Sequence, residues 1–290
     1  MPFPLPYPSL GRGYSSWDIM SSDDCSASVL IVRRISMTTT PMGPDQVCSF
    51  PAGNRVHVWR IPLEVDPASA REFSDLLTPV EHARAARFVR DEDRCRFQIG
   101  RAATRRILGK YLGVPPAQVG IDPDQRGKPQ LHATRVPLDR QVHFNITHSG
   151  DWILAAFAHG FPVGIDVESI RAAGTTEDLA DYLMSDGERR AFNALPQDQR
   201  PAAFLQCWTS KEAFLKGTGV GLTAALRSIE VAIDPDQPAQ LLAAPSELRP
   251  GDWQLHRLKF AAPYAAILAV AAMSAEIVDI SVDSWRDIHC

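Results

Sequence analysis

The pattern of apolar and polar positions divides the chain into two similar series of elements. Strict alternation predicts strands and a 3.6-residue period predicts helices, with Gly and Pro at their ends. In chain order we expect strand 56–61, helix 81–112, strand 141–146, a hairpin of strands 152–158 and 163–167, helices 178–195 and 202–217, and strands 253–260 and 264–270. Because strand, helices and strands occur twice, we predict an α+β fold of two pseudo-symmetric halves that meet near residue 160.

Glycines mark the ends of the two long helices. Gly100 is expected to divide the helix 81–112, and Gly113 with the prolines behind it to end that helix. Gly217 is expected to end the helix 202–217.

The first 50 residues differ from the rest of the chain. Proline alternates near the start, Ser, Thr and Gly are frequent, and periodicity is almost absent, which is typical of a disordered extension. We therefore divide the chain into an extension 1–53, an N-terminal half 54–161, a C-terminal half 162–275 and a tail 276–290.

Composition narrows the class of protein. The 290 residues are 45% hydrophobic and carry a net charge of −4, so nothing demands nucleic acid or an acidic membrane as partner. The five cysteines lack C-x-x-C spacing, which favours a reducing, cytoplasmic setting. The longest apolar stretch, 264–273, is much shorter than a membrane span.

Two carboxylates share one face of the strand that reads Val-Gly-Ile-Asp-Val-Glu from residue 163. Its branched residues face a core, whereas Gly164, Asp166 and Glu168 share the opposite face. Like charges this close repel unless a cation lies between them, and Mg²⁺ suits carboxylate oxygens with a phosphate. Gly164 would leave space beside the ion. The alternative is a solvated polar face.

Glu212 and Lys216 lie four residues apart and share a helix face. At about 100° per residue, Glu212 falls between Trp208 and Leu205, within the apolar stripe. A desolvated carboxylate is a better proton acceptor near neutral pH, and Lys216 could bind a phosphate oxygen. Lys211 could pair with Glu212 or with a substrate. The alternative is a surface ion pair worth about 0.2–0.5 kcal/mol.

Four further features lie near these motifs. His148 follows a strand beside the acidic hairpin, and Lys128 is presented by a Gly-Lys-Pro turn; either could contact phosphate or be ordinary surface. Glu188 is either the capping-box partner of Ser185 or a third carboxylate for the metal. Eight arginines between residues 84 and 106 form either a solvated helix face or a surface for a polyphosphate ligand.

Together these motifs resemble the 4′-phosphopantetheinyl transferases of the surfactin-synthetase-activating type. The match rests on Phe-Asn-Ile-Thr-His-Ser-Gly from residue 144, the acidic strand from 163, and Trp-Thr-Ser-Lys-Glu-Ala-Phe-Leu-Lys from 208, with Gly-Lys-Pro from 127. The resemblance implies transfer of the phosphopantetheine arm of coenzyme A to a serine of an acyl or peptidyl carrier protein, an acidic helical bundle. It also implies Mg²⁺ dependence, release of adenosine 3′,5′-bisphosphate, and a monomer with its active site between the halves.

The resemblance also implies roles for individual residues. Phe97 departs from the family, because at least one member has a hydroxyl residue there near the 3′-phosphate, and so which arginine binds that phosphate stays open. Thr147 replaces a serine and keeps the hydroxyl. The implied set is Asp166, Glu168 and Glu188 for the metal, Glu212 as base, Lys216 for the α-phosphate and leaving group, Arg84, Lys128 and His148 for the nucleotide phosphates, and Asn145 and Thr147 for the pocket.

Two other functions use the same residues. A metal-dependent phosphohydrolase would use the carboxylates to activate water against coenzyme A. A non-catalytic regulator would only bind coenzyme A, although Asp166, Glu168, Glu212 and Lys216 are all present.

Overall fold

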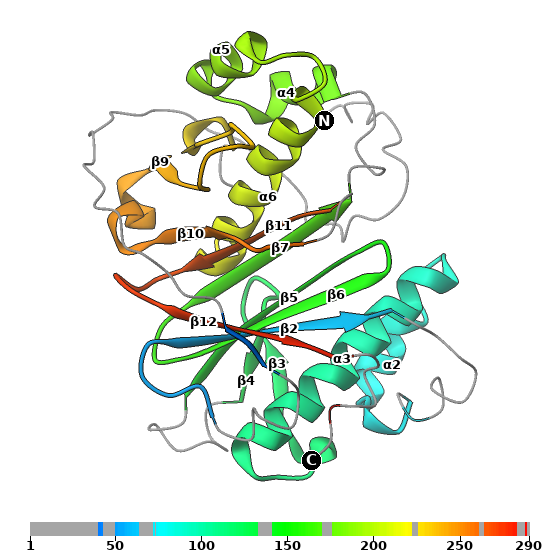
Figure 1. The fold of residues 1–290 in the computed structure, drawn as a ribbon. Helices are drawn as coiled ribbons and strands as arrows, with labels where there is room; N and C mark the ends of the chain where they lie inside the picture. The colour runs from blue at the N-terminus through cyan, green and yellow to red at the C-terminus, as the bar shows by residue number, and fades with distance from the viewer. Residues whose placement is uncertain are drawn as a thin grey trace.

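Two sheets pack face to face, and a long helix covers the outer face of each (Figure 1). The computed structural model describes residues 40–42, 50–63, 72, 74–132, 141–169, 176–221, 226–260, 264–282 and 288. Most of the predicted extension 1–53 lies outside these residues. No helix in the described part of the chain is long and apolar enough to cross a bilayer.

The N-terminal half consists of a sheet, two helices and a short ribbon. Its elements are β2 (Arg55–Pro62), α2 (Pro79–Ala85), α3 (Asp91–Leu112), the 3₁₀ turn η2 (Pro116–Gln118), β3 (Ile121–Pro123), β4 (Pro129–Leu131), β5 (Val142–Ser149) and β6 (Trp152–His159). In the sheet, β6 lies antiparallel between β2 and β5, while β3 and β4 form a separate antiparallel ribbon.

The C-terminal half repeats this plan. Its elements are β7 (Val163–Ser169), α4 (Thr176–Leu183), α5 (Asp186–Ala194), α6 (Arg200–Thr218), β8 (Glu230–Val231), β9 (Leu241–Ala243), β10 (Gln254–Arg257) and β11 (Tyr264–Val270), with 3₁₀ turns η6 (Leu226–Ser228), η7 (Ser246–Leu248) and η8 (Pro250–Asp252). Here β11 lies antiparallel between β7 and β10, and β8 and β9 form the ribbon. The order β2-β6-β5 is thus matched by β7-β11-β10, which confirms the predicted α+β fold of two pseudo-symmetric halves.

The predicted tail is part of the first sheet. Strand β12 (Glu276–Ser281) lies parallel to β2 on one side and to β1 (Thr40–Met42) on the other. The boundary placed at residue 276 therefore separates a strand from its own sheet, and residues 40–42 of the predicted extension are paired. Pairing between such distant segments leaves no local signal in the sequence.

The predicted helices differ from the observed ones at their ends. The segment 81–112 forms α2 and α3 with a break at 86–90, whereas Gly100 lies inside α3. Gly113 does end α3, in the left-handed conformation (φ 67°). Ser185 caps α5 and so divides the predicted helix 178–195, and α6 ends at Gly219 (φ 73°), not at Gly217.

Three apolar clusters hold the layers together. One joins α3 to the first sheet, one joins α6 to the second sheet, and the third lies between the two sheets. The sheets meet where the edge strands β5 and β7 lie side by side, and α6 packs on β7 (Figure 1). The predicted site residues of β7, β5 and α6 therefore lie at this junction.

Candidate active site

The acidic strand β7 uses its two faces as predicted. Its branched residues lie in the cluster between the sheets, and Gly164 on the opposite face contacts α6. A Cβ at Gly164 would lie 2.0 Å from the carbonyl oxygen of Ala213 and 2.3 Å from the backbone nitrogen of Gly217. We had expected this glycine to leave space for an ion. It instead allows α6 to approach the strand that carries the carboxylates.

Polar side chains of β5 hydrogen-bond to the edge of β7. Thr147 Oγ1 donates to Asp166 Oδ1 at 3.0 Å, and Ser149 Oγ donates to Glu168 Oε2 at 3.0 Å. Asn145 Oδ1 accepts from a backbone N–H of β7 at 2.9 Å. Strand β5 therefore orients both carboxylates, while the amide of Asn145 ties the two sheets together.

Lys216 brings α6 into this group. Its ammonium donates to Asp166 Oδ1 at 2.5 Å and to Thr147 Oγ1 at 3.3 Å. Burial alone would lower the pKa of Lys216, but the carboxylates of Asp166 and Glu212 raise it above its ordinary value. The side chain of Lys216 is therefore a cation at neutral pH.

Glu212 is the third carboxylate of the cluster. It is only 8% exposed, and burial, opposed by Lys216 and reinforced by Asp166, raises its pKa to about 7. Burial and the neighbouring charge of Asp166 likewise raise the pKa of Glu168 to about 8, and burial raises that of Asp166. Since Glu212 can exchange a proton near pH 7, its predicted use as a general base fits its environment.

Two carboxylate oxygens of the cluster lack a partner. Among the described residues, Asp166 Oδ2 and Glu212 Oε1 are buried and accept no hydrogen bond. Such oxygens suit a hard cation, and Mg²⁺ in proteins takes one or two carboxylates together with waters and substrate phosphates. The described residues contain no group of three or more His, Cys, Asp or Glu side chains that could hold a metal ion. A magnesium ion at Asp166 and Glu168 stays a prediction; the free Oδ2 of Asp166 suits such an ion, which would need waters or a phosphate as further ligands.

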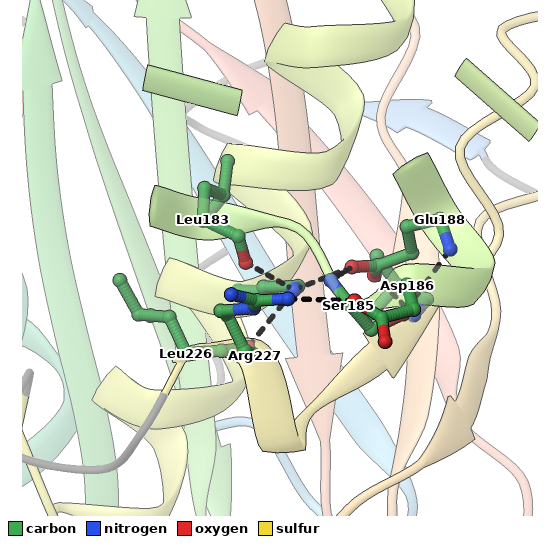
Figure 2. A network of polar contacts seen from close by, with 8 residues as sticks. Leu183, Ser185, Asp186, Glu188, Leu226 and Arg227 are labelled. Atoms are coloured by element: carbon green, nitrogen blue, oxygen red, sulfur yellow. Dashed lines mark hydrogen bonds and ion pairs between the residues drawn. The ribbon is translucent and has the colours of Figure 1, made fainter. Parts of the chain in front are cut away.

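Glu188 lies on α5 in a separate polar network (Figure 2). Its Oε2 accepts from the ammonium of Lys211 at 2.7 Å and from the backbone N–H of Ser185 at 2.7 Å, and its Oε1 accepts from the N–H of Val231 at 2.8 Å. Both oxygens are thus in use, and the capping box with Ser185 is complete. The prediction that Glu188 is a third metal ligand has no support in this geometry, because Glu212, not Glu188, lies beside Asp166.

Lys211 does not pair with Glu212 or face a substrate. It is fully buried, and besides Glu188 it donates to the carbonyl oxygens of Leu183 at 2.8 Å and Leu226 at 2.9 Å (Figure 2). The ammonium therefore has three acceptors for its three N–H groups. This network joins α4, α5 and η6 to the residue that precedes Glu212.

His148 lies on β5 between Thr147 and Ser149. Burial, with the positive charges of Lys216 and Arg96, lowers the pKa of His148 to about 4. The imidazole is therefore neutral near pH 7, and it would contact a phosphate as a hydrogen-bond donor, not as a cation.

Lys128 lies beside Lys216, but its ammonium points to backbone oxygens. It donates to the carbonyls of Lys216 at 2.5 Å and Gly217 at 3.0 Å. Burial lowers the pKa of Lys128 to about 8. Its predicted contact with a nucleotide phosphate stays a prediction.

Arg84 belongs to an arginine cluster on α2 and α3. The guanidinium carbons of Arg84 and Arg101 lie 5.3 and 5.5 Å from the ring centre of Phe97. Burial lowers the pKa of Arg101 to about 10, and among the described residues Arg101 Nη1 and Arg105 Nη2 are buried donors without an acceptor. The ring of Phe97 thus contacts two guanidinium cations.

Two functional residues escaped the sequence reasoning. Ser149 lies beyond the predicted strand 141–146, yet β5 extends to Ser149, and alternation from Thr147 would have placed its side chain on the face of the carboxylates. Lys211 was placed near the reacting groups because it precedes Glu212, and nothing in the sequence shows which acceptors it reaches.

Comparisons with known proteins identify the family that the chain resembles. A family model described as the 4′-phosphopantetheinyl transferase superfamily matches residues 162–269, and one described as 4′-phosphopantetheinyl transferase, N-terminal, matches residues 66–159. The 4′-phosphopantetheinyl transferase HetI of Nostoc sp. is 40% identical over 203 residues, which cover 69% of this chain and 84% of that protein. A 4′-phosphopantetheinyl transferase of Bacillus subtilis is 33% identical over 173 residues, covering 59% and 74%. The transferase Sfp of Bacillus subtilis strain 168 is 28% identical over 164 residues, covering 57% and 70%.

The chain belongs to the 4′-phosphopantetheinyl transferase superfamily. It is therefore an enzyme of the transferase class, and the resemblance to the surfactin-synthetase-activating type is confirmed.

Proposed function

We propose that this enzyme transfers the 4′-phosphopantetheine group of coenzyme A to a serine of an acyl or peptidyl carrier protein and releases adenosine 3′,5′-bisphosphate. The observation that carries the proposal is the group formed by the buried carboxyls of Asp166 and Glu212 and the partly exposed side chain of Lys216. It combines a proton acceptor, a fixed cation and free carboxylate oxygens within one site.

Glu212 activates the serine. A serine hydroxyl is a weak nucleophile at neutral pH and needs a base within hydrogen-bond reach. The free, buried Oε1 of Glu212, on a carboxyl whose pKa is about 7, takes the hydroxyl proton as the serine oxygen bonds to the β-phosphorus.

Lys216 stabilises the charge that develops on the leaving group. The bond between the β-phosphorus and the oxygen that bridges to the α-phosphate breaks, and the electron pair stays on adenosine 3′,5′-bisphosphate. A fixed ammonium beside that oxygen stabilises the transition state more than it stabilises bound coenzyme A. Asp166 and Thr147 hold the ammonium before substrate binds.

Asp166 and Glu168 hold Mg²⁺ in this proposal. The ion, when bound, supplies positive charge to the pyrophosphate oxygens. Thr147 and Ser149 keep the two carboxylates oriented through their hydroxyl groups.

The arginine cluster and His148 bind the nucleotide. Arg84 and Arg101 offer donors for the 3′-phosphate beside Phe97, and neutral His148 donates a hydrogen bond closer to the pyrophosphate. Asn145 and Thr147 line the pocket wall on β5.

Carrier proteins of this kind are acidic helical bundles, and a basic surface would attract them. Arg84, Arg87 and Arg90 are exposed on and after α2, next to the proposed nucleotide site, although the net charge of the chain is −4. We propose that the enzyme works as a cytoplasmic monomer whose docking surface includes these arginines.

The test is the intact mass of a panel of apo carrier proteins after incubation with the enzyme, coenzyme A and Mg²⁺. We expect the mass of one phosphopantetheine to be added, and no addition to a carrier whose acceptor serine is replaced by alanine. If no carrier on the panel gains mass while coenzyme A binds in calorimetry, the non-catalytic regulator replaces this proposal.

A further inference from the structure

From the contacts of the ribbon β3–β4, we infer that Lys128 is a positioning residue: it clamps the C-terminal turn of α6 across the two halves and so fixes Lys216. The expected effect of this contact on the transfer rate rests on the function proposed above, whereas the contact itself does not. Its structural part is tested separately below.

The C-terminus of α6 needs partners for its last carbonyl groups, because a helix leaves these without intrahelical donors. The N–H of Gly219 and the hydroxyl of Thr218 both donate to the carbonyl of Leu215 at 3.0 Å. The next two carbonyls, of Lys216 and Gly217, accept from the ammonium of Lys128 at 2.5 and 3.0 Å. A cation at this end of the helix is also favoured by the helix dipole.

The turn that carries Lys128 is itself held rigidly. Asp124 Oδ1 accepts from the backbone N–H groups of Arg126 and Lys128, both at 2.8 Å, and the N–H of Asp124 donates to the carbonyl of Lys128 at 2.8 Å. Gly127 supplies the positive φ of 84° that the turn requires. The ammonium is therefore presented by a preorganised turn, and the Arg126 guanidinium adds a contact to the carbonyl of Gly219 at 3.2 Å.

The same helical turn also packs tightly at Gly217. A Cβ on Gly217 would lie 2.5 Å from the ring of Trp253 and 3.2 Å from the backbone nitrogen of Gly164. The turn is thus packed against β7 and Trp253 and is also hydrogen-bonded by Lys128.

The consequence falls on Lys216, which is held at both ends. Lys128 binds its backbone carbonyl, while Asp166 and Thr147 bind its ammonium. Lys128 comes from the N-terminal half and α6 from the C-terminal half. The position of the Lys216 ammonium therefore depends on this contact between the two halves.

The experiment compares Lys128→Met and Lys128→Arg with Arg126→Met. The last variant removes a charge from the same turn but touches neither carbonyl that Lys128 binds. For each variant we measure the Kd of coenzyme A by calorimetry, the single-turnover transfer rate at saturating coenzyme A, and hydrogen exchange of residues 213–221.

For Lys128→Met we expect a transfer rate reduced at least about tenfold, a Kd for coenzyme A within about threefold of the wild type, and faster exchange in 213–221. Lys128→Arg should recover most of the rate, and Arg126→Met should change the three readouts less. A Kd that rises about tenfold or more, with unchanged exchange and unchanged saturated rate, would show that Lys128 is a phosphate ligand and overturn the clamp.

The clamp and the proposed function fail differently. If the wild type transfers nothing to any carrier, the function is wrong, and hydrogen exchange still decides whether Lys128 holds the end of α6. Unchanged exchange in Lys128→Met contradicts the clamp whatever the activity.

Discussion

Replacing Lys211 by methionine tests whether the buried ion pair with Glu188 holds α6 in place. Lys211 is fully buried and the Glu188 side chain is 1% exposed, so neither charge can reach water in the native state. In Lys211→Met, Glu188 keeps the N–H groups of Ser185 and Val231 but loses its cation, and the carbonyls of Leu183 and Leu226 each lose the hydrogen bond from Lys211.

Breaking a buried pair by removing one partner costs about 3–5 kcal/mol. The two remaining hydrogen bonds to Glu188 favour the lower end, about 3 kcal/mol. Since domains are typically stable by about 5–15 kcal/mol, this is a large share of the total.

The assay is urea unfolding followed by circular dichroism. The matched control is Arg227→Met, which breaks the nearby pair with Asp186 (Figure 2); these side chains are 56% and 81% exposed. The control should lose less than about 1 kcal/mol. The double variant Lys211→Met with Glu188→Met should be more stable than Lys211→Met alone, because no buried charge remains. A loss below about 1 kcal/mol in Lys211→Met would refute the reasoning.

Two further predictions concern the close approach of α6 and the charge of the site. Gly164→Ala should lower both the melting temperature and the transfer rate, because the new Cβ would lie 2.0 Å from the carbonyl oxygen of Ala213. The control Gly100→Ala, whose Cβ would have no atom within 4 Å, should stabilise α3 by up to about 1 kcal/mol. Equal melting temperatures for the two variants would contradict this. Folding raises the pKa of Glu168 from 4.5 to about 8 and that of Glu212 from 4.5 to about 7, so the folded protein favours the protonated carboxyls. With EDTA present, the free energy of unfolding should therefore fall as the pH rises from 4.5 to about 8. The rise in melting temperature on adding Mg²⁺ should therefore be larger at pH 8 than at pH 6, and an equal rise would argue against a carboxylate metal site.

Local pattern was sufficient for the central elements of the site. Alternation placed Asp166 and Glu168 on one face of a strand, and helical spacing placed Glu212 in a buried position beside Lys216. Both inferences need only the geometry of a single strand or helix. The family resemblance then added the chemistry that these groups serve.

Long-range contacts could not be predicted in the same way. The motif from Ser185 to Glu188 has the same sequence whether its carboxylate caps a helix, binds a metal or meets Lys211, and only packing distinguishes these uses. Gly164 illustrates the same limit, because space for an ion and close contact with a helix both require glycine. Strand β12 is placed by its partner β2 from the other end of the chain.

The most direct test of the proposed transfer is the stoichiometry of adenosine 3′,5′-bisphosphate release, measured by chromatography in parallel with carrier mass. Direct attack by the carrier serine predicts one nucleotide released for each phosphopantetheine transferred, and none when apo carrier protein is omitted. Release of the nucleotide from coenzyme A and Mg²⁺ without any carrier would show that water is the acceptor. That result would contradict the role of Glu212 as the base for a protein serine.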